Sequence, residues 1–263
     1  MRIVVLIKPV PDPASAGERL GPDDRLDRAA VPAVVNGNDE YVLEAALKLV
    51  EAAGEGEITL LAMAPANAPE TLRKALAMGA HRGVHVTDPA LAGSCAVSTA
   101  RVLAAALREL EFDMVFAGID SSDGVGGIVP AAVAAHLGLP YLSYAARIEP
   151  DMASRTVRVR RISPTGYDLL EAPLPAVIGG TQALGEPRYP SLKGIMAARG
   201  KEIVTRSMAD LGLDSAGIGG GAATTAVLGT QMPPTRGATE IVRGSPDDGA
   251  ARIVEFLAER RII

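Results

Sequence analysis

Short apolar runs alternate along residues 1–140 with longer stretches rich in Ala and Leu. The runs hold many β-branched residues and few polar ones, which is typical of strands buried on both faces. They lie at residues 2–10, 57–65, 83–88 and 112–120. Between them, apolar residues recur at helical spacing in residues 38–53, 68–79, 95–110 and 129–138. This alternation predicts an α/β fold, a doubly wound and mostly parallel sheet with flavodoxin-like layering.

The ends of these helices carry local signals. We expect Asp39 or Asn38 to cap the first helix, because short polar side chains accept hydrogen bonds from free N–H groups there. Gly79 and Gly138 are expected to end the second and fourth helices, and Pro130 suits a first helical turn.

The pattern changes after residue 140. Shorter strands are predicted at residues 145–149, 156–162, 167–171 and 176–178, with turn residues between them. In residues 155–162, Arg alternates with Val or Ile, which indicates one buried face and one solvated, basic face. We interpret these strands as an antiparallel extension of the sheet.

The end of the chain differs again in composition. Residues 212–238 are rich in Gly, Ala and Thr and have too little apolar surface to fold alone. An amphipathic helix is expected over residues 246–261, with Ser245 as its cap, acids in its first turn and Arg260 and Arg261 in its last. The sequence therefore predicts an α/β domain over residues 1–205 and an extended arm plus helix over residues 206–263.

Composition narrows the function classes. Apolar residues make up 48% of the 263 residues and aromatic residues only 3%, so the core is expected to be aliphatic. A net charge of −5 argues against nucleic-acid binding, which needs a basic face. Cys95 is the single cysteine, which excludes an internal disulfide and a cysteine-cluster metal site. No window reaches the length of a membrane span, and the N-terminal run is interpreted as a strand, so a cytoplasmic protein is expected.

Three loops follow the predicted parallel strands, at residues 34–40, 62–65 and 117–130. Ligands of doubly wound sheets bind at the carboxyl ends of the strands, where the strand order reverses. The third loop is rich in Gly, carries Ser121 and Ser122, and leads into a helix, so its N–H groups can bind a phosphate. It matches no standard phosphate-loop motif, and an ordinary βα loop is the alternative.

Few other residues suggest chemistry. Asp120 and Asp123 could hold ribose hydroxyls or a cation, although helix capping is favoured on residue chemistry alone. Lys8 could face a phosphate or solvent. The three histidines lack metal-ligand spacing, and neither a catalytic triad nor a carboxylate pair is indicated. The sequence thus predicts a binding site without obvious catalytic groups.

Several segments, taken in order, resemble the β subunit of electron-transfer flavoproteins. They are VLIKPVPD (5–12), NDEYVLEAALKL (38–49), PETLRKALAMGAHRG (69–83), the loop from Gly118, LPAVIGG (174–180), GEPRYPSLKGIMAARGK (185–201) and DLGLD (210–214). The resemblance covers roughly residues 1–214. Its most specific parts are the Ala-Met-Gly-Ala and Glu-Pro-Arg-Tyr sequences.

The resemblance implies an adenine-nucleotide-binding subunit of a heterodimer, an electron carrier without catalytic residues of its own. It shuttles electrons from primary dehydrogenases, such as acyl-CoA dehydrogenases, to a membrane quinone oxidoreductase or another acceptor. The α subunit holds most of the FAD, and the β subunit holds AMP or, in bifurcating members, a second FAD. The nucleotide contacts implied for this chain are Leu6, Asn36, Gly37, Asn38, Asp39, Met63, Gly118, Asp120, Ser121, Ser122, Asp123, Gly124, Val125, Gly126, Gly127, Ile128 and Val129.

The sequence departs from the family pattern at three places. His81 stands where Asp is common, and Gly185 stands where Asn precedes Glu-Pro. Residues 123–130 read DGVGGIVP instead of an acidic run followed by Asn-Gln-Thr-Gly. The hydroxyl and amide that would bind phosphate are replaced by Ile128 and Val129, so the choice between AMP, FAD and an empty site stays open.

Residues 183–201 correspond to the family's recognition loop, which docks partner dehydrogenases. Prolines restrict its backbone, so docking costs less entropy. Leu192 matches the family's anchor leucine and is expected to protrude, whereas Ile195 and Met196 are expected to pack a short helix onto the core. The docking residues implied are Glu186, Pro187, Arg188, Tyr189, Leu192, Ile195 and Met196.

The C-terminal arm and helix are expected to wrap the α subunit, because an arm with no core of its own needs another surface. Two other classes remain as alternatives. One is an ATP-hydrolysing or adenylating enzyme, which lacks support because the chain has no phosphate-loop lysine. The other is a homodimeric adenine-nucleotide sensor.

Overall fold

The computed structural model describes residues 1–15, 19–28, 30–214, 217–231 and 241–263. The chain divides into two units, Met1–Val227 and Leu228–Ile263. The sequence placed the boundary after residue 205, but Met208 and Ile218 are 5% and 3% exposed and pack in the core of the first unit. Their burial explains why this unit extends beyond the change in composition. Residues 215–216 and 232–240 of the predicted arm lie outside the described residues.

The first unit is built on one sheet, which has nine strands among the described residues. Its order is β11 (Ile203–Arg206), β5 (Arg82–Val86), β4 (Glu57–Met63), β1 (Arg2–Leu6), β6 (Met114–Gly118), β10 (Ala176–Gly180), β7 (Tyr141–Asp151), β8 (Thr156–Ser163) and β9 (Gly166–Pro173). Strands β11 to β7 are parallel to their neighbours, and β8 and β9 are antiparallel. The mostly parallel α/β fold is confirmed.

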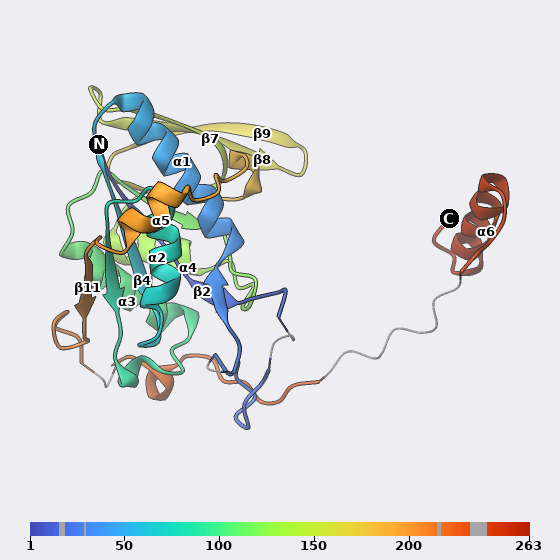
Figure 1. Ribbon diagram of the computed structural model, residues 1–263, viewed down its shortest axis with the longest axis horizontal. Helices are drawn as coiled ribbons and strands as arrows, with labels where there is room; N and C mark the ends of the chain where they lie inside the picture. Colours follow the sequence, from blue (N-terminus) through green and yellow to red (C-terminus); the bar gives the residue numbers. More distant parts are fainter. Residues whose placement is uncertain (16–18, 29, 215–216, 232–240) are drawn as a thin grey trace. The chain divides into compact units, whose positions relative to one another are not determined.

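Helices cover both faces of this sheet (Figure 1). In β1, Ile3 and Val5 face a core shared with α1 (Gly37–Ala53) and α2 (Pro69–Met78). Val4 and Leu6 face a second core shared with α3 (Ala96–Arg108) and α4 (Val129–Leu137). A strand that is apolar on both sides is what a central parallel position requires.

The strand order reverses at β1, which lies between β4 and β6. After β1 the chain builds β4 and β5 on one side and then crosses to β6 on the other. The loops after β1 and β6 therefore meet at a topological switch point, where ligands of this fold class bind.

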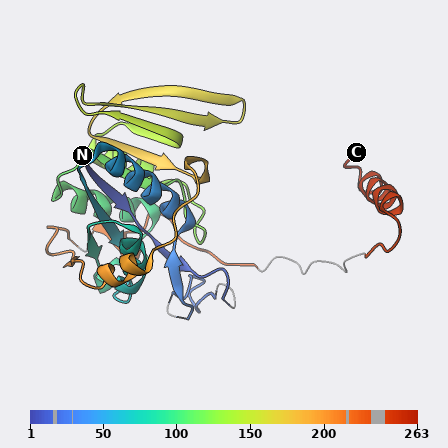
Figure 2. The same cartoon turned by 45° about the horizontal axis from the view of Figure 1, so that its top comes forward.

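One strand that the sequence assigned to the antiparallel extension, residues 176–178, was placed wrongly. It is part of β10, which lies between β6 and β7, parallel to both, and all five residues of β10 are buried. The antiparallel part is β7 to β9, which projects at the top of Figure 2. In β8, Val157 and Val159 are buried while Arg158 and Arg160 are exposed, which confirms the predicted alternation.

Several short elements were not predicted. Strand β3 (Ala33–Val35) forms a small antiparallel pair with β2 (Pro9–Pro11), whose residues 9 and 10 were predicted as the end of the first strand, and β11 extends the sheet beside β5. Short 3₁₀ turns occur at η1 (Pro89–Leu91), η2 (Gln182–Leu184) and η4 (Gly220–Ala222). Three-residue strands and turns are too short to leave a periodic signal.

The second unit contains α6 (Pro246–Glu259). Ser245 caps it in a reciprocal capping box with Asp248, as a cap signal predicts. The helix ends at Glu259, so Arg260 is its C-cap residue instead of part of the last turn, and its guanidinium lies 4.3 Å from the centre of the Phe256 ring. Within the described residues, no helix is both long and apolar enough to span a membrane.

Candidate functional site

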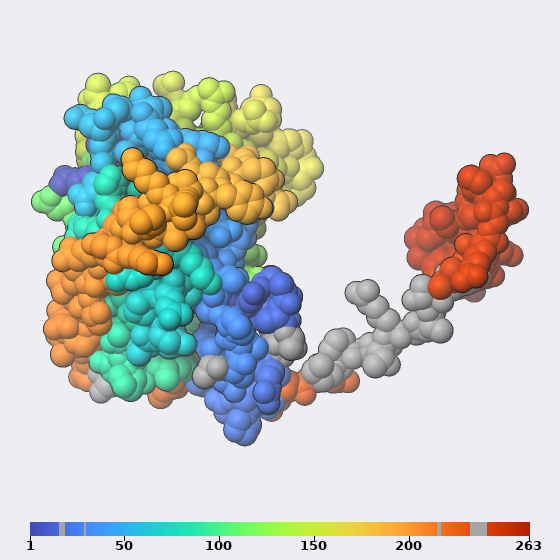
Figure 3. All heavy atoms as spheres, in the orientation of Figure 1, coloured from blue at the N-terminus to red at the C-terminus, as the bar shows by residue number. Residues whose placement is uncertain are grey.

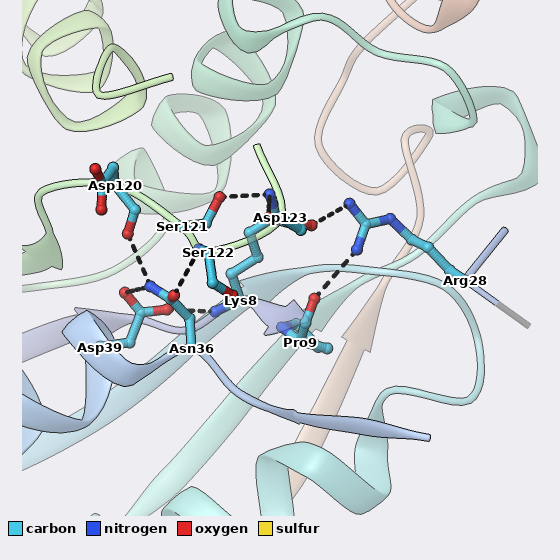
Figure 4. Close-up of polar contacts among 9 residues, drawn as sticks. All are labelled: Lys8, Pro9, Arg28, Asn36, Asp39, Asp120, Ser121, Ser122 and Asp123. Atoms are coloured by element: carbon cyan, nitrogen blue, oxygen red, sulfur yellow. Dashed lines mark hydrogen bonds and ion pairs between the residues drawn. The ribbon is translucent and has the colours of Figure 1, made fainter. Parts of the chain in front are cut away.

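The switch point collects side chains from three loops (Figure 4). Lys8 follows β1, Asn36 and Asp39 lie at the start of α1, and Ser121 and Asp123 follow β6. These loops are joined by hydrogen bonds between residues as far as 115 positions apart in sequence. The structure therefore brings together the loops 34–40 and 117–130 that the sequence selected.

Asp39 is the buried centre of this arrangement. Its carboxylate accepts hydrogen bonds from the backbone N–H of Lys8 (2.7 Å), from Asn36 Nδ2 (3.1 Å) and from the backbone N–H of Gly118 (3.2 Å). Burial raises the pKa of Asp39 to about 7, even though these three bonds and the Lys8 charge act to lower it. Asp39 thus ties the ends of β1 and β6 to α1.

The capping prediction for α1 is wrong. Asn36 is the N-cap residue, and its side chain makes no capping bond. Its Nδ2 donates instead to the Asp120 carbonyl (2.8 Å), and its Oδ1 accepts from the Ser122 N–H (3.2 Å). Asn38 Nδ2 donates to Asp120 Oδ1 at 2.7 Å. Asn36 and Asn38 thus bind the loop after β6 instead of capping the helix.

Asp123 is held by two cations. Its carboxylate contacts Lys8 Nζ at 2.7 Å and Arg28 Nη2 at 2.6 Å, and Lys8 Nζ also donates to Ser121 Oγ at 2.8 Å. Burial alone would raise the pKa of Asp123, but the bonds from Lys8, Ser121 and Arg28 lower it to about 2. Neither this residue nor Asp120 caps α4, whose N-cap is Ile128 without a side-chain bond, so the capping interpretation of both is wrong.

Sequence reasoning missed Arg28 and left the role of Lys8 undecided. The position of Lys8, directly after a buried strand at the switch point, was an available signal. Nothing in the sequence pointed to Arg28, because it lies 95 positions before its partner Asp123. Both side chains are partly exposed, 40% for Lys8 and 38% for Arg28.

The rest of the loop is open to solvent. Residues 124–128 are exposed, and no described residue accepts a hydrogen bond from the backbone N–H groups of Gly126, Gly127 or Ile128. Val125 has a φ of 44°, a left-handed conformation that costs energy for a β-branched residue. Free N–H groups beside a helix N-terminus and two cations fit an anionic phosphate.

Gly118 explains how closely the loops approach. A Cβ atom there would lie 2.4 Å from Asp39 Oδ1 and 2.8 Å from Asn38 Cβ. Glycine is therefore required for the carboxylate to reach the Gly118 N–H. Two further predicted contacts are less accessible, because the Leu6 side chain is 7% exposed in the core and Met63 is partly buried against the same core.

A second region of interest is residues 183–201, which form η2, an irregular stretch and α5 (Leu192–Ala198). The orange segment lies on the surface across α1 and α2 in Figure 3. Tyr189 is 96% exposed, Leu192 75%, Met196 65% and Ile195 46%. The exposure of Leu192 is as predicted, but the predicted packing of Ile195 and Met196 onto the core is wrong.

The contact between α5 and the core has a different basis. Ala198 is 2% exposed and belongs to the core. At Gly194, an added Cβ atom would lie 2.4 Å from the Ala77 carbonyl oxygen, so the two backbones approach closely. Small residues therefore attach α5 to α2, which leaves its large side chains outside.

Arg188 does not project from this segment. Its Nε donates to Glu44 Oε2 (2.7 Å), and its Nη1 and Nη2 donate to the two oxygens of Glu51 (2.5 and 2.9 Å). Both glutamates lie on α1. The other residues of the segment expected to dock include Glu186, which is exposed, and Pro187, which is half-buried.

Comparison with known proteins gives a consistent result. The model of the electron transfer flavoprotein domain matches residues 25–211. Proteins named electron transfer flavoprotein subunit beta are similar along their whole length. The one from Mycobacterium bovis is 40% identical, with 99% of each chain covered, and the one from Thermoanaerobacterium thermosaccharolyticum is 35% identical, with 100% of each covered.

A third relative has a different name. Subunit CarD of the caffeyl-CoA reductase-Etf complex of Acetobacterium woodii is 32% identical, with 100% of each chain covered. The family match over residues 25–211 and the full-length similarity to these relatives agree with each other. This chain therefore belongs to the family of electron transfer flavoprotein β subunits.

Proposed function

We propose that this chain pairs with an α subunit that holds most of the FAD, and that the heterodimer carries electrons from primary dehydrogenases to an acceptor. Acyl-CoA dehydrogenases are the proposed donors and a membrane quinone oxidoreductase is the proposed acceptor. The observation that carries the proposal is 40% identity over 99% of the chain to a protein named as such a β subunit. In this assembly, the flavin supplies the redox chemistry.

The switch-point loops are the proposed nucleotide site of this subunit. Lys8 and Arg28 would face the phosphate, and the N–H groups of Gly126, Gly127 and Ile128 would donate to it. The same donors suit AMP or the pyrophosphate of a second FAD, because both present phosphate oxygens. AMP is the primary proposal, and a second FAD would indicate a bifurcating form.

We propose no catalytic residue in this chain. The carboxylates of the site are engaged structurally, since Asp39 accepts three hydrogen bonds and Asp123 is paired with two cations. Among the described residues, no cluster of His, Cys, Asp or Glu could hold a metal ion. The role of the subunit is to bind and position other components.

The second unit is the proposed contact with the α subunit. Its helix α6 has no buried residue, and several of its apolar side chains are exposed, among them Ile253 (60%) and Val254 (56%). Apolar side chains on one amphipathic helix gain stability by packing on another surface. An α subunit is the partner that this family membership suggests.

The nucleotide proposal is tested by co-expression with the α subunit and release of bound nucleotides by denaturation. We expect a yellow heterodimer that releases one AMP besides one FAD. Release of two FAD and no AMP per heterodimer would mean that this subunit binds a second flavin instead of AMP. A colourless homodimer with bound ATP would refute the proposal and favour a nucleotide sensor.

The docking proposal is tested at Leu192. Because truncation of an anchor side chain costs about 2 kcal/mol, Leu192→Ala should raise the KM of an acyl-CoA dehydrogenase for the heterodimer roughly thirtyfold. Arg199→Ala, an exposed position at the C-terminal end of α5, is the control and should leave KM within about twofold. Unchanged kinetics in Leu192→Ala would refute docking through this residue.

A further inference from the structure

Arg188 is the most strongly bonded side chain of segment 183–201. Its guanidinium donates through Nε, Nη1 and Nη2 to the carboxylates of Glu44 and Glu51, and its backbone N–H donates to Glu44 Oε2 at 3.2 Å. Glu44 is almost fully buried, with 4% of its side chain exposed, whereas Glu51 is 56% exposed. Every nitrogen of the guanidinium is thus used within the chain.

The two glutamates are seven positions apart, which places them about two turns apart on the same face of α1. A planar guanidinium can bridge two carboxylates at fixed angles, which an ammonium cannot. Arg188 therefore fixes the backbone of segment 183–201 against α1, immediately before the exposed Tyr189.

The other end of the segment is fixed on α2. Arg73 Nη1 donates to the Ala198 carbonyl at 2.8 Å, and Lys201 Nζ donates to the carbonyls of Leu76 (3.0 Å) and Ala80 (2.6 Å). Arg73, on α2, thus binds the C-terminal end of α5, and Lys201, which follows α5, binds the C-terminal end of α2. The exposed side chains of Tyr189 and Leu192 lie between two anchored ends.

We propose that Arg188 is a positioning residue for partner docking, which holds residues 189–192 in their binding conformation by bridging Glu44 and Glu51. This inference rests on the proposed docking function of Leu192. It assigns Arg188 a role within the subunit instead of a contact with the partner. Docking onto an ordered segment avoids the entropy cost of ordering it during association.

The sharpest test changes α1 and leaves the segment itself intact. In the full heterodimer, Glu51→Gln removes one carboxylate from Arg188, and Arg188→Lys keeps the charge but cannot bridge both acids. Glu55→Gln is the matched control, because Glu55 is also exposed and lies four positions beyond Glu51. KM and kcat are measured with an acyl-CoA dehydrogenase as electron donor, and hydrogen exchange is measured for the backbone amides of residues 185–192.

We expect Glu51→Gln and Arg188→Lys to raise KM roughly threefold to tenfold, with kcat unchanged, and to speed amide exchange in residues 185–192. Glu55→Gln should change neither. In a Leu192→Ala background, the same substitutions should raise KM no further, because the anchor that they position is gone.

Three results would overturn the inference. One is faster exchange with an unchanged KM in the Arg188 and Glu51 variants, while Leu192→Ala raises KM; this leaves docking intact and removes only the positioning role. Another is unchanged amide exchange in both variants. The third is an unchanged KM in Leu192→Ala, which refutes the docking function and this inference together.

Discussion

The switch-point loops and segment 183–201 both attach to α1, but they use its side chains in opposite ways. At the start of α1, Asp39 is buried and its donors come from two strand ends. In the middle and last part of α1, Glu44 and Glu51 hold Arg188 so that apolar side chains stay outside. The switch point buries polar groups and provides them with hydrogen-bond partners. Segment 183–201 exposes apolar side chains and has its backbone held in place by ion pairs.

This difference separates stability from binding. An unpaired buried polar group lowers the free energy of unfolding, whereas an exposed apolar side chain adds little to it and gains energy only when a partner covers it. Substitutions of the buried groups at the switch point should therefore act mainly on the free energy of unfolding, and substitutions on the exposed surface of segment 183–201 mainly on association. Four predictions test this contrast, in order of decreasing effect on stability.

The largest effect is expected for Asp39→Ala. It leaves the N–H groups of Lys8 and Gly118 and the Asn36 amide without their acceptor, which should lower the free energy of unfolding by about 4 kcal/mol. Denaturant unfolding of the heterodimer measures this. Asp120→Ala, which removes one accepted side-chain bond from Asn38, is the control at about 1 kcal/mol. Equal effects of the two substitutions would contradict a central role of Asp39.

Gly118→Ala should cost about 3 kcal/mol, because the new Cβ atom would overlap the Asp39 carboxylate and Asn38. Thermal unfolding is the measurement. Gly126→Ala lies in the same loop, with its nearest neighbouring atom at 3.9 Å, and should cost less than about 1 kcal/mol. A tolerated alanine at position 118 would mean that the two loops are not in close contact.

Asp123→Asn should cost about 1 to 2 kcal/mol at neutral pH, since its partners are partly exposed and solvent weakens the pairs. The lowered pKa of Asp123 gives stability that is complete above about pH 4 and is lost as the pH falls towards about 2. This acid-dependent loss should be smaller in Asp123→Asn than in the parent. Identical acid titrations of the two proteins would rule out the ion pairs.

Asp39 acts with the opposite sign and in a different range of pH. Its pKa is raised to about 7, so its protonation favours the folded state and this contribution is lost as the pH rises from about 4 to about 7. The two carboxylates of one site can thus be told apart by stability measured against pH.

The smallest effect on stability is expected on the exposed surface of segment 183–201. Tyr189→Ala and Met196→Ala should change the free energy of unfolding by less than about 0.5 kcal/mol, because both side chains are mostly exposed. Ala198→Leu, at a buried position of the same helix, is the contrasting variant and should be clearly destabilising. Large losses at Tyr189 or Met196 would mean that these side chains stabilise the fold and would erase the contrast between the regions.

The sequence predicted the central architecture because its periodicity reflects burial. Helix α2 ends at Gly79 and α4 at Gly138 as expected, and apolar runs became β1, β4, β5 and β6. The loops of the candidate site were found by a topological rule that needs only the strand order. Predictions of this kind depend on local pattern and general connectivity.

The errors concern contacts between distant residues. The ion pairs of Asp123 join it to residues 115 and 95 positions away, and Arg188 reaches Glu44 across 144 positions. Local rules favoured helix caps for Asp39, Asp120 and Asp123, but tertiary partners used these carboxylates instead. The packing of α5 was misjudged because small residues, Gly194 and Ala198, make the contact that large apolar residues were expected to make.

Helix α1 has 17 residues, about 26 Å of continuous backbone, and carries both attachments on one rigid body. An inserted or deleted residue between Asp39 and Glu44 would rotate Glu44 and Glu51 by about 100° around the helix axis relative to Asp39. Either Asp39 would then no longer point to its donors, or Glu44 and Glu51 would no longer point to Arg188. The number of residues between these acids is therefore fixed, and insertions or deletions should be tolerated only in loops outside α1.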